Sequence, residues 1–216
     1  MIEIKTSTLT KRRNDMGNPI KINQQDAFVL IDGQNDFIRK DGALYVAGVK
    51  GELANEEMIR KIVALFRRPF GHRTASKDKH PNKRHIEYGI YGKHCAKDTL
   101  GQQAHDDLRY IYCAIDDELE KGMRLALISH SAAFSPKFGK HIAALRQKKI
   151  KRIFLAGWAF THCVGESAIA YAIQGFEVYV VRNLCRSVPP PYGNPQLMKR
   201  KLKDYGVKLI NSDQIK

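Results

Sequence analysis

Ala27-Phe28-Val29-Leu30-Ile31-Asp32 is the stretch that decides the fold, because five apolar residues follow one another and end at a carboxylate. A strand with one face in water alternates apolar and polar residues. An unbroken apolar run is instead typical of a strand buried on both faces of a parallel sheet. Residues 150–157 and 176–181 are further apolar segments of strand length. The stretch therefore predicts a parallel sheet covered on both faces.

The segments between these strands have helical periodicity. Residues 56–66 place Met58, Ile59 and Ile62 on one helical face, which predicts an amphipathic helix. Three more helices are predicted over residues 138–147, 164–173 and 195–205, and short strands over residues 125–128 and 207–210. Strands that alternate with helices predict an α/β fold, here a three-layer α/β/α arrangement with a mostly parallel sheet.

The length of 216 residues suits one domain with a sizeable core, and no linker or repeat divides the chain. We expect a polar N-terminal extension over residues 1–25 and a single domain over residues 26–216. The composition, 43% hydrophobic and 27% charged, is that of a globular protein. Because we find no apolar run of membrane-span length and no signal-peptide pattern, the expected location is the cytoplasm, where the four cysteines would stay reduced.

The net charge of +15 is high for a small enzyme and would attract anionic partners, nucleic acid included. The densest basic runs are residues 11–13, 148–152 and 199–203. None of these runs has the interleaved aromatic residues of a surface that binds single strands. We therefore interpret the charge as a solvated surface. A basic nucleic-acid-binding protein remains the alternative from a different functional class.

Asp32 and Cys163 each follow an apolar strand, so a parallel sheet would bring both to the edge where its strands end. Cys163 stands where a strand turns into a helix, and the N–H groups at a helix start favour a thiolate and could hold an oxyanion. A carboxylate beside it could take the thiol proton and later deliver it to a leaving amine. Lys121 could add a positive charge that lowers the pKa of both groups. Taken singly, each residue also fits a structural role: an inert thiol, a solvated carboxylate and a surface lysine.

Asp78 and His80 lie two residues apart, so on an extended segment both side chains point to the same face. His94 supplies a third donor further along the chain. Two imidazoles and one carboxylate suit one divalent metal ion, with positions left open for water or substrate. Zinc is expected first, although iron and manganese also fit. The surrounding residues 74–121 are polar and expected to be irregular, as functional segments often are.

Several segments resemble motifs of the isochorismatase-like cysteine hydrolases and of their nicotinamidase/pyrazinamidase branch. Residues 31–37 (Ile-Asp-Gly-Gln-Asn-Asp-Phe) resemble the opening motif of this family. Residues 78–81 (Asp-Lys-His-Pro) are similar to the metal motif Asp-Trp-His-Pro, and residues 91–95 (Tyr-Gly-Lys-His-Cys) resemble Trp-Pro-Pro-His-Cys.

Two further segments continue the resemblance in the same order. Lys121-Gly122, followed by residues 131–134 (Ser-Ala-Ala-Phe), is similar to a Lys-Gly and Ser-Ala-Phe pattern. Residues 157–164 resemble Gly-Leu-Ala-Thr-Asp-Tyr-Cys-Val. Each motif is weak alone, but five in order over about residues 26–212 are specific.

The resemblance implies a nicotinamidase, which hydrolyses nicotinamide to nicotinate and ammonia and feeds pyridine nucleotide salvage. It implies Cys163 as the nucleophile, Asp32 as general base and then acid, and Lys121 as the group that stabilises their charges. The intermediate would be a thioester. The N–H groups of Ala159 and Cys163 would form the oxyanion hole, beside a cis peptide bond at Trp158–Ala159.

The resemblance also implies that a metal ion on Asp78, His80 and His94 orients the pyridine nitrogen of a small-molecule amide. His85 is a further candidate ligand. Phe37 and Tyr91 are the expected walls for a flat aromatic ring.

Five positions depart from the family pattern and bear on the shape of the pocket: Lys79, Tyr91, His130, Phe160 and Thr161. A cysteine amidohydrolase of the same fold that acts on a carbamoyl or ureido substrate is therefore the alternative, although such relatives generally lack the metal motif. Cys163 argues against a sibling that hydrolyses the vinyl ether of isochorismate. The oligomeric state is open, and a homo-oligomer is compatible with the sequence.

Overall fold

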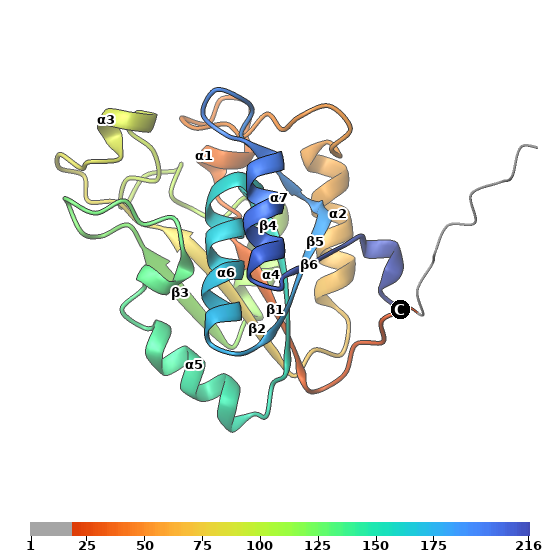
Figure 1. Cartoon of the computed structure of the whole chain (residues 1–216). Helices are drawn as coiled ribbons and strands as arrows, with labels where there is room; N and C mark the ends of the chain where they lie inside the picture. Colours follow the sequence, from red (N-terminus) through yellow and green to blue (C-terminus); the bar gives the residue numbers. More distant parts are fainter. Residues whose placement is uncertain (1–18) are drawn as a thin grey trace, which may run out of the picture.

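The computed structural model describes residues 19–216, in which six strands form a single sheet (Figure 1). The strand order is β3-β2-β1-β4-β5-β6, so the chain starts near the centre of the sheet, builds one edge and then the other. Every neighbouring pair is parallel, as the apolar run at the start of the domain predicts. In chain order the strands are β1 (Asp26–Ile31), β2 (His72–Asp78), β3 (Asp117–Lys121), β4 (Arg152–Trp158), β5 (Glu177–Arg186) and β6 (Lys208–Ile210).

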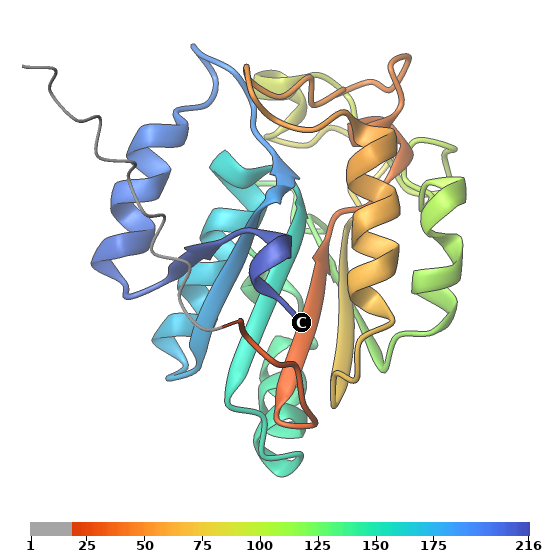
Figure 2. The ribbon, with the colours of Figure 1, turned by 90° about the vertical axis from the view of Figure 1, so that its right-hand side faces the viewer.

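Helices cover both faces of this sheet, which confirms the predicted three-layer α/β/α arrangement (Figure 2). One face carries α2 (Asn55–Phe66) and the short α4 (Arg109–Cys113). The other face carries α5 (Phe138–Gln147), α6 (Gly165–Ile173) and α7 (Pro195–Asp204). The shorter helical segments are α1 (Asn35–Ile38), α3 (Tyr88–Tyr91), the 3₁₀ turns η1 (Asp106–Leu108), η2 (Ala132–Phe134) and η4 (Ser212–Gln214), and the π-helical turn η3 (Phe160–Val164).

β1 runs through the middle of the molecule and divides the core in two. Phe28 and Leu30 pack on the side of α2 and α4, whereas Val29 and Ile31 pack on the side of α5, α6 and α7. Every residue of β1 is buried, and each large apolar side chain contributes about 1.5–3 kcal/mol by leaving water. β1 is therefore held from both faces, and its end delivers Asp32 to the edge of the sheet where the strands end.

The predicted strand over residues 125–128 is wrong. Leu125 and Ile128 are exposed at 51% and 38%, and the segment is a turn followed by an irregular stretch. A short apolar run marks a strand only where a second surface covers it, and here none of the described layers does. The predicted helices are present, but the helical run expected from Val164 already begins at Phe160.

The expectation of an irregular segment over residues 74–121 is also wrong in part, since it contains most of β2 and all of β3. β2 has no apolar run because several of its buried residues are polar, Thr74, Ser76 and Asp78 among them. β3 is an edge strand in which only Leu119 and Lys121 are buried. β2 thus buries polar residues, and β3 is only partly buried, so neither strand has the apolar run that marks a strand in the sequence.

Of the predicted N-terminal extension, residues 1–18 lie outside the described residues. From residue 19 onward the chain packs on the domain: Ile20 bridges Ile215, and Ile22 is buried. Among the described helices, none has the length and hydropathy needed to span a bilayer. The domain limits remain a prediction from the sequence.

Glu52 fastens the loop after α1 to the end of β5. Its carboxylate accepts hydrogen bonds from the Ser187 hydroxyl (2.6 Å), the Ser187 N–H (2.9 Å) and the Val49 N–H (3.0 Å), and it pairs with Arg182. Burial acts to raise the pKa of Glu52, but the hydrogen bonds from Ser187 and Arg182 outweigh it, so the pKa lies below its ordinary value of 4.5. The bonds fix the relative position of two segments that border the cavity described below.

We predict that Glu52→Gln lowers the free energy of unfolding by about 1–3 kcal/mol at neutral pH, because buried donors lose a charged acceptor. Since the folded-state pKa is depressed, the contribution of Glu52 is full above pH 4.5 and is lost as the pH falls through the folded-state pKa. Urea unfolding at several pH values measures both effects. Glu57→Gln is the matched control, because Glu57 makes only an exposed pair with Lys61, and it should stay within about 0.5 kcal/mol of the wild type. Equal losses in the two variants would contradict the prediction.

Candidate functional site

A cavity of about 280 Å³ lies where the strands end, and residues of the loops that follow α1, β2 and β5 line it. Figure 2 shows these loops above the ends of the strands. Six residues predicted for the site line the cavity: Phe37, Asp78, Tyr91, His94, Ala159 and Cys163. Three others, Asp32, His80 and Lys121, lie behind this wall with exposed fractions of 1% or less. The structure therefore brings these nine predicted residues together around one cavity.

Lys121 lies at the centre of this group. Its ammonium is 2.9 Å from Asp32 Oδ2 and 3.5 Å from Cys163 Sγ, and it donates to Asp78 Oδ1. The topology explains the meeting: Asp78 and Lys121 are register partners at the ends of β2 and β3, and Asp32 directly follows β1. One buried cation therefore contacts the predicted nucleophile, the predicted base and one predicted metal ligand.

Burial and this lysine together set the charge state of the group. Burial raises the pKa of the Asp32 carboxyl, against the opposing effect of Lys121. Burial also raises the pKa of the Cys163 thiol well above its ordinary value, again against Lys121. For Lys121 itself, burial acts to lower the pKa, but Asp32 and Asp78 outweigh it, and the pKa lies well above its ordinary value. The resting cysteine is thus a protonated thiol beside a carboxylate with raised proton affinity, which is the arrangement for a proton transfer from sulfur to oxygen.

Ser76 and Gln34 hold the two carboxylates in place. The Ser76 hydroxyl donates to Asp32 Oδ1 at 2.6 Å. The Gln34 side chain donates to the Asp78 carbonyl (2.7 Å) and accepts from the Asp78 N–H (2.8 Å), so it acts as an additional strand partner for the end of β2. Gln34 belongs to the opening motif, but the sequence predicts no role for it, because its partner is backbone and leaves no pattern in the sequence.

Cys163 lies in η3, the π-helical turn that joins β4 to α6. The Trp158–Ala159 peptide bond before this turn is cis, as the resemblance to the hydrolase family implied. The Ala159 carbonyl accepts hydrogen bonds from the N–H groups of His162 (3.1 Å) and Val164 (3.0 Å), which winds the turn tightly around Cys163. Cys163 keeps an exposed fraction of 7%, so its sulfur is buried among the site residues while it still borders the cavity.

Asp78, His80 and His94 fit a metal ion by the chemistry of their donor atoms. Their ligand atoms lie within 4.8 Å of one another, and all three residues are buried. His80 Nδ1 is 2.9 Å from the Gly122 carbonyl and His94 Nδ1 is 2.8 Å from the Gly92 carbonyl. A carbonyl only accepts, so each Nδ1 carries the proton and each Nε2 keeps its lone pair.

Two further observations support this fit. His80 Nε2 finds no hydrogen-bond partner within residues 19–216, and burial lowers the pKa of His80 to about 4, so the imidazole is neutral near pH 7. Gly122 has a φ of +81°, and an added Cβ would lie 2.6 Å from His80 Nδ1. The glycine next to Lys121 is therefore required for the carbonyl to reach the histidine.

His85 stands apart from this ligand set. Its Nε2 lies 2.8 Å from the Arg124 carbonyl, and its Nδ1 accepts from the Glu87 N–H at 3.2 Å, so both nitrogens are engaged. Glu87 is a further residue for which the sequence predicted no role: it borders the cavity, is 2% exposed, and has Oε2 3.7 Å from His80 Nε2. Burial raises the pKa of Glu87. Only its place in the fold identifies it, since it lies seven residues from His80 within an irregular segment.

The remaining walls of the cavity combine aromatic rings, imidazoles and aliphatic side chains. Phe37 and Tyr91 both line the cavity, and their rings lie 5.9 Å and 6.2 Å from the ring of His94. The Tyr91 hydroxyl is 3.2 Å from His130 Nε2, and burial lowers the pKa of His130 to about 4. His130 and His162 thus contribute neutral imidazoles to this wall, beside the ring of Tyr91.

The chain matches a family profile and several solved structures. The profile described as "Isochorismatase domain" matches residues 26–214. The crystal structure of PnC1 from L. infantum in complex with nicotinate is 25% identical, with a TM-score of 0.77, and the alignment covers 92% of this chain and 98% of that one.

Two other solved structures, of enzymes with different names, also resemble this chain. The pyrazinamidase of Pyrococcus horikoshii in complex with zinc is 22% identical, with a TM-score of 0.67 and coverage of 87% and 99%. The N-carbamoylsarcosine amidase of Thermoplasma acidophilum is 22% identical, with a TM-score of 0.63 and coverage of 88% and 98%. Both share the fold of this chain. Among curated protein sequences, none matches.

We predict that Lys121→Met destabilises the metal-free protein by roughly 3–5 kcal/mol, because two buried carboxylates lose the cation between them. Urea unfolding in the presence of a chelator measures this loss. Lys201→Met is the control: Lys201 pairs with Glu166 at the surface, and its removal should cost less than about 1 kcal/mol. A Lys121→Met protein as stable as this control would show that Lys121 does not compensate the buried carboxylates.

Proposed function

The chain belongs to the isochorismatase-like hydrolase family, and we propose that it is a metal-dependent nicotinamidase, which hydrolyses nicotinamide to nicotinate and ammonia. The observation that carries the proposal is the position of Lys121, which contacts Cys163, Asp32 and Asp78 beside one cavity. A cysteine with a carboxylate and a lysine suits attack on an amide carbonyl. The adjacent group of two imidazoles and a carboxylate could hold a metal ion, which suits a substrate with a ring nitrogen. The neighbour that binds nicotinate supports the same substrate class.

In the first half of the reaction, the Cys163 thiol gives its proton to Asp32 and its sulfur attacks the carboxamide carbon. The tetrahedral oxygen then bears a negative charge, which the N–H groups of Ala159 and Cys163 would stabilise. Asp32 returns the proton to the leaving nitrogen, the carbon–nitrogen bond breaks, and ammonia departs. The acyl group remains on Cys163 as a thioester.

In the second half, Asp32 takes a proton from a water molecule that attacks the thioester carbonyl. The carbon–sulfur bond breaks, the thiolate takes the proton back, and the carboxylic acid leaves. Lys121 keeps a positive charge next to Asp32 and Cys163 throughout, and so stabilises each anionic form as it appears.

The metal group and the aromatic walls would position the substrate. A divalent ion on Asp78, His80 and His94, with zinc proposed first, would supply a coordination position for the pyridine nitrogen. Phe37 and Tyr91 would confine the flat ring. The zinc complex of the pyrazinamidase neighbour supports this choice of metal. Participation in pyridine nucleotide salvage, a cytoplasmic location and a homo-oligomeric state remain predictions.

The second candidate is an amidohydrolase of a carbamoyl or ureido substrate, which the likeness to N-carbamoylsarcosine amidase supports. Both candidates use the same three residues, so the triad does not separate them. The metal group favours a pyridine amide, because a ureido substrate has no ring nitrogen to coordinate. A basic nucleic-acid-binding function stays an untested alternative from the charge alone.

We predict that the metal-loaded wild-type protein releases ammonia from nicotinamide and that Cys163→Ala lowers kcat/KM by roughly four orders of magnitude or more. Cys113→Ala is the control, because Cys113 is exposed and lies outside the cavity, and it should keep wild-type activity. An ammonia assay with nicotinamide and a panel of ureido amides measures both points. Wild-type turnover of a ureido amide alone would replace the first candidate by the second.

We further predict that His94→Ala binds one equivalent of zinc fewer than the wild type, because it removes one of three ligands. His85→Asn is the matched variant: its amide can keep bonds to the backbone, so it should bind as much zinc as the wild type. Elemental analysis after dialysis against limiting zinc measures the content. A loss of zinc in His85→Asn with none in His94→Ala would show that the ion is bound by His80, His85 and Glu87 instead.

A further inference from the structure

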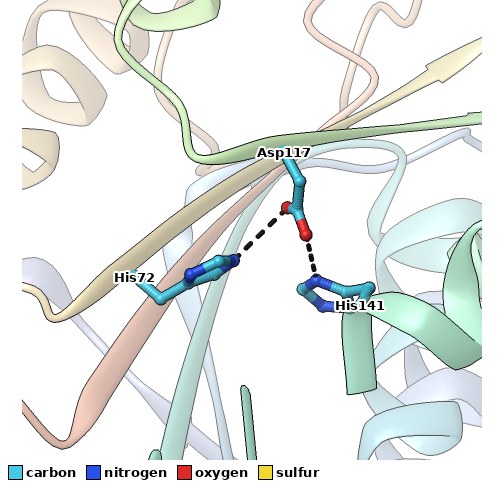
Figure 3. Close-up of side chains that lie close together, drawn as sticks. All are labelled: His72, Asp117 and His141. Atoms are coloured by element: carbon cyan, nitrogen blue, oxygen red, sulfur yellow. Dashed lines mark hydrogen bonds and ion pairs between the residues drawn. The ribbon is translucent and has the colours of Figure 1, made fainter. Parts of the chain in front are cut away.

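Three ionisable side chains meet at the end of the sheet where the strands begin, which is the end opposite the cavity (Figure 3). His72 is the first residue of β2, Asp117 is the first residue of β3, and His141 projects from α5. Asp78 and Lys121 stand at the far ends of the same two strands. A strand of this length spans roughly 20 Å, so the two places are separate. Nothing in the proposed reaction uses this cluster.

Both imidazoles are aimed at the Asp117 carboxylate, as Figure 3 shows. His141 Nδ1 lies 2.7 Å from Asp117 Oδ2, and His72 Nε2 lies 3.4 Å from Asp117 Oδ1. The three ligand atoms all lie within 4.8 Å of one another. Two imidazoles and a carboxylate are the same donor set as at the first metal group.

The cluster is buried yet incompletely bonded. His72 and His141 are 3% and 2% exposed. His72 Nε2 and Asp117 Oδ1 find no hydrogen-bond partner within residues 19–216, although they face each other. These two atoms form an ion pair 3.4 Å long, which is longer than a good hydrogen bond and leaves room for an ion between the three side chains.

The outward nitrogens of both rings lie next to polar groups. His141 Nε2 lies 2.9 Å from the buried Tyr171 hydroxyl. His72 Nδ1 lies 3.8 Å from Asp116 Oδ2 and 3.0 Å from Lys148 Nζ. A ligating histidine carries its proton on the nitrogen away from the metal, where a hydroxyl or carboxylate accepts it. Tyr171 is placed to do this for His141. For His72, Asp116 can do it only after Lys148, whose ammonium donates to Nδ1 in this structure, has turned away.

We propose that His72, Asp117 and His141 form a second binding site for a divalent transition metal of the zinc class. The ligand atoms are His72 Nε2, His141 Nδ1 and the Asp117 carboxylate, with water in the fourth position. Asp117 has a side-chain exposure of 26%, which leaves a path for the ion and the water from solvent.

Small adjustments admit the ion. Tetrahedral zinc at its usual bond lengths separates its ligand atoms by about 3.3 Å. The His72–Asp117 distance already matches this spacing, whereas the His141–Asp117 distance has to lengthen by about 0.6 Å. Lys148 has to turn away from His72; its side chain is 42% exposed and remains paired with Asp116 at 2.8 Å. The positive charge of the ion is compensated by Asp116 and Asp117.

The site would join β2, β3 and α5, of which β3 is held by few apolar contacts. β3 is an edge strand with a single buried apolar residue, Leu119, and α5 covers the same side of the molecule. An ion at the beginning of β3 would fix this strand to β2 and α5. Because Lys121 ends the same strand, the second ion would also help to hold the central lysine in place.

The proposal is tested on the full-length protein after a chelator has removed its metal. Zn²⁺ is then added as the only metal, and calorimetry measures how many equivalents bind. The wild type should bind two equivalents, and Asp117→Asn and His94→Ala one equivalent each. Asp106→Asn is the matched control, because Asp106 makes only an exposed pair with Arg109, and it should bind two. Circular dichroism identifies any variant that fails to fold.

A wild-type crystal soaked in Zn²⁺ gives a measurement that needs no variant. An anomalous peak is expected between His72, Asp117 and His141, in addition to one at the first metal group. The proposal is overturned by a crystal in which the first group is filled and this position is empty. A folded Asp117→Asn protein that still binds as much zinc as the wild type would overturn it as well.

Discussion

The ammonium of Lys121 is buried between two carboxylates, and the arrangement of the site depends on it. Asp32 and Asp78 are both withdrawn from water, and two carboxylates this close repel each other unless a cation lies between them. The lysine reaches both and also approaches Cys163 to 3.5 Å. The proposed nucleophile and its base can therefore share one cavity with the proposed metal group. Lys121 makes this possible because it compensates the charges of Asp32 and Asp78.

The parallel sheet makes this contact available. Three adjacent strands, β1, β2 and β3, end side by side and deliver Asp32, Asp78 and Lys121 to the same edge. The beginnings of β2 and β3 carry His72 and Asp117, so the same pair of strands bears a donor cluster at each end. The two ends differ in what covers them: long loops close over the cavity, whereas α5 and Tyr171 of α6 pack against the second cluster. This difference leaves the second cluster nearer to solvent.

The sequence predicted the fold, and it named the residues that the structure brings together at the cavity, because apolar runs and motif order record them directly. β1 and the helices α2 and α5 follow from periodicity, and the family resemblance placed Asp32, Lys121 and Cys163 before any geometry was known. β2 was missed, since its buried residues are polar and stabilised by contacts that distant segments provide. Gln34 and Glu87 were missed for the same reason: one bonds to backbone 44 residues away, and the other comes from an irregular loop. Such roles depend on tertiary contacts, which single-sequence patterns do not contain.

The most direct test of the account is to identify the covalent intermediate. Metal-loaded protein would be mixed with excess nicotinamide, quenched in acid during turnover, digested and analysed by mass spectrometry. The account predicts a nicotinoyl group on the peptide that contains Cys163, released by hydroxylamine as expected for a thioester. An acyl group on a different residue, or steady ammonia release with no acylated peptide at any time point, would contradict the central role given to Cys163 and its contacts with Asp32 and Lys121.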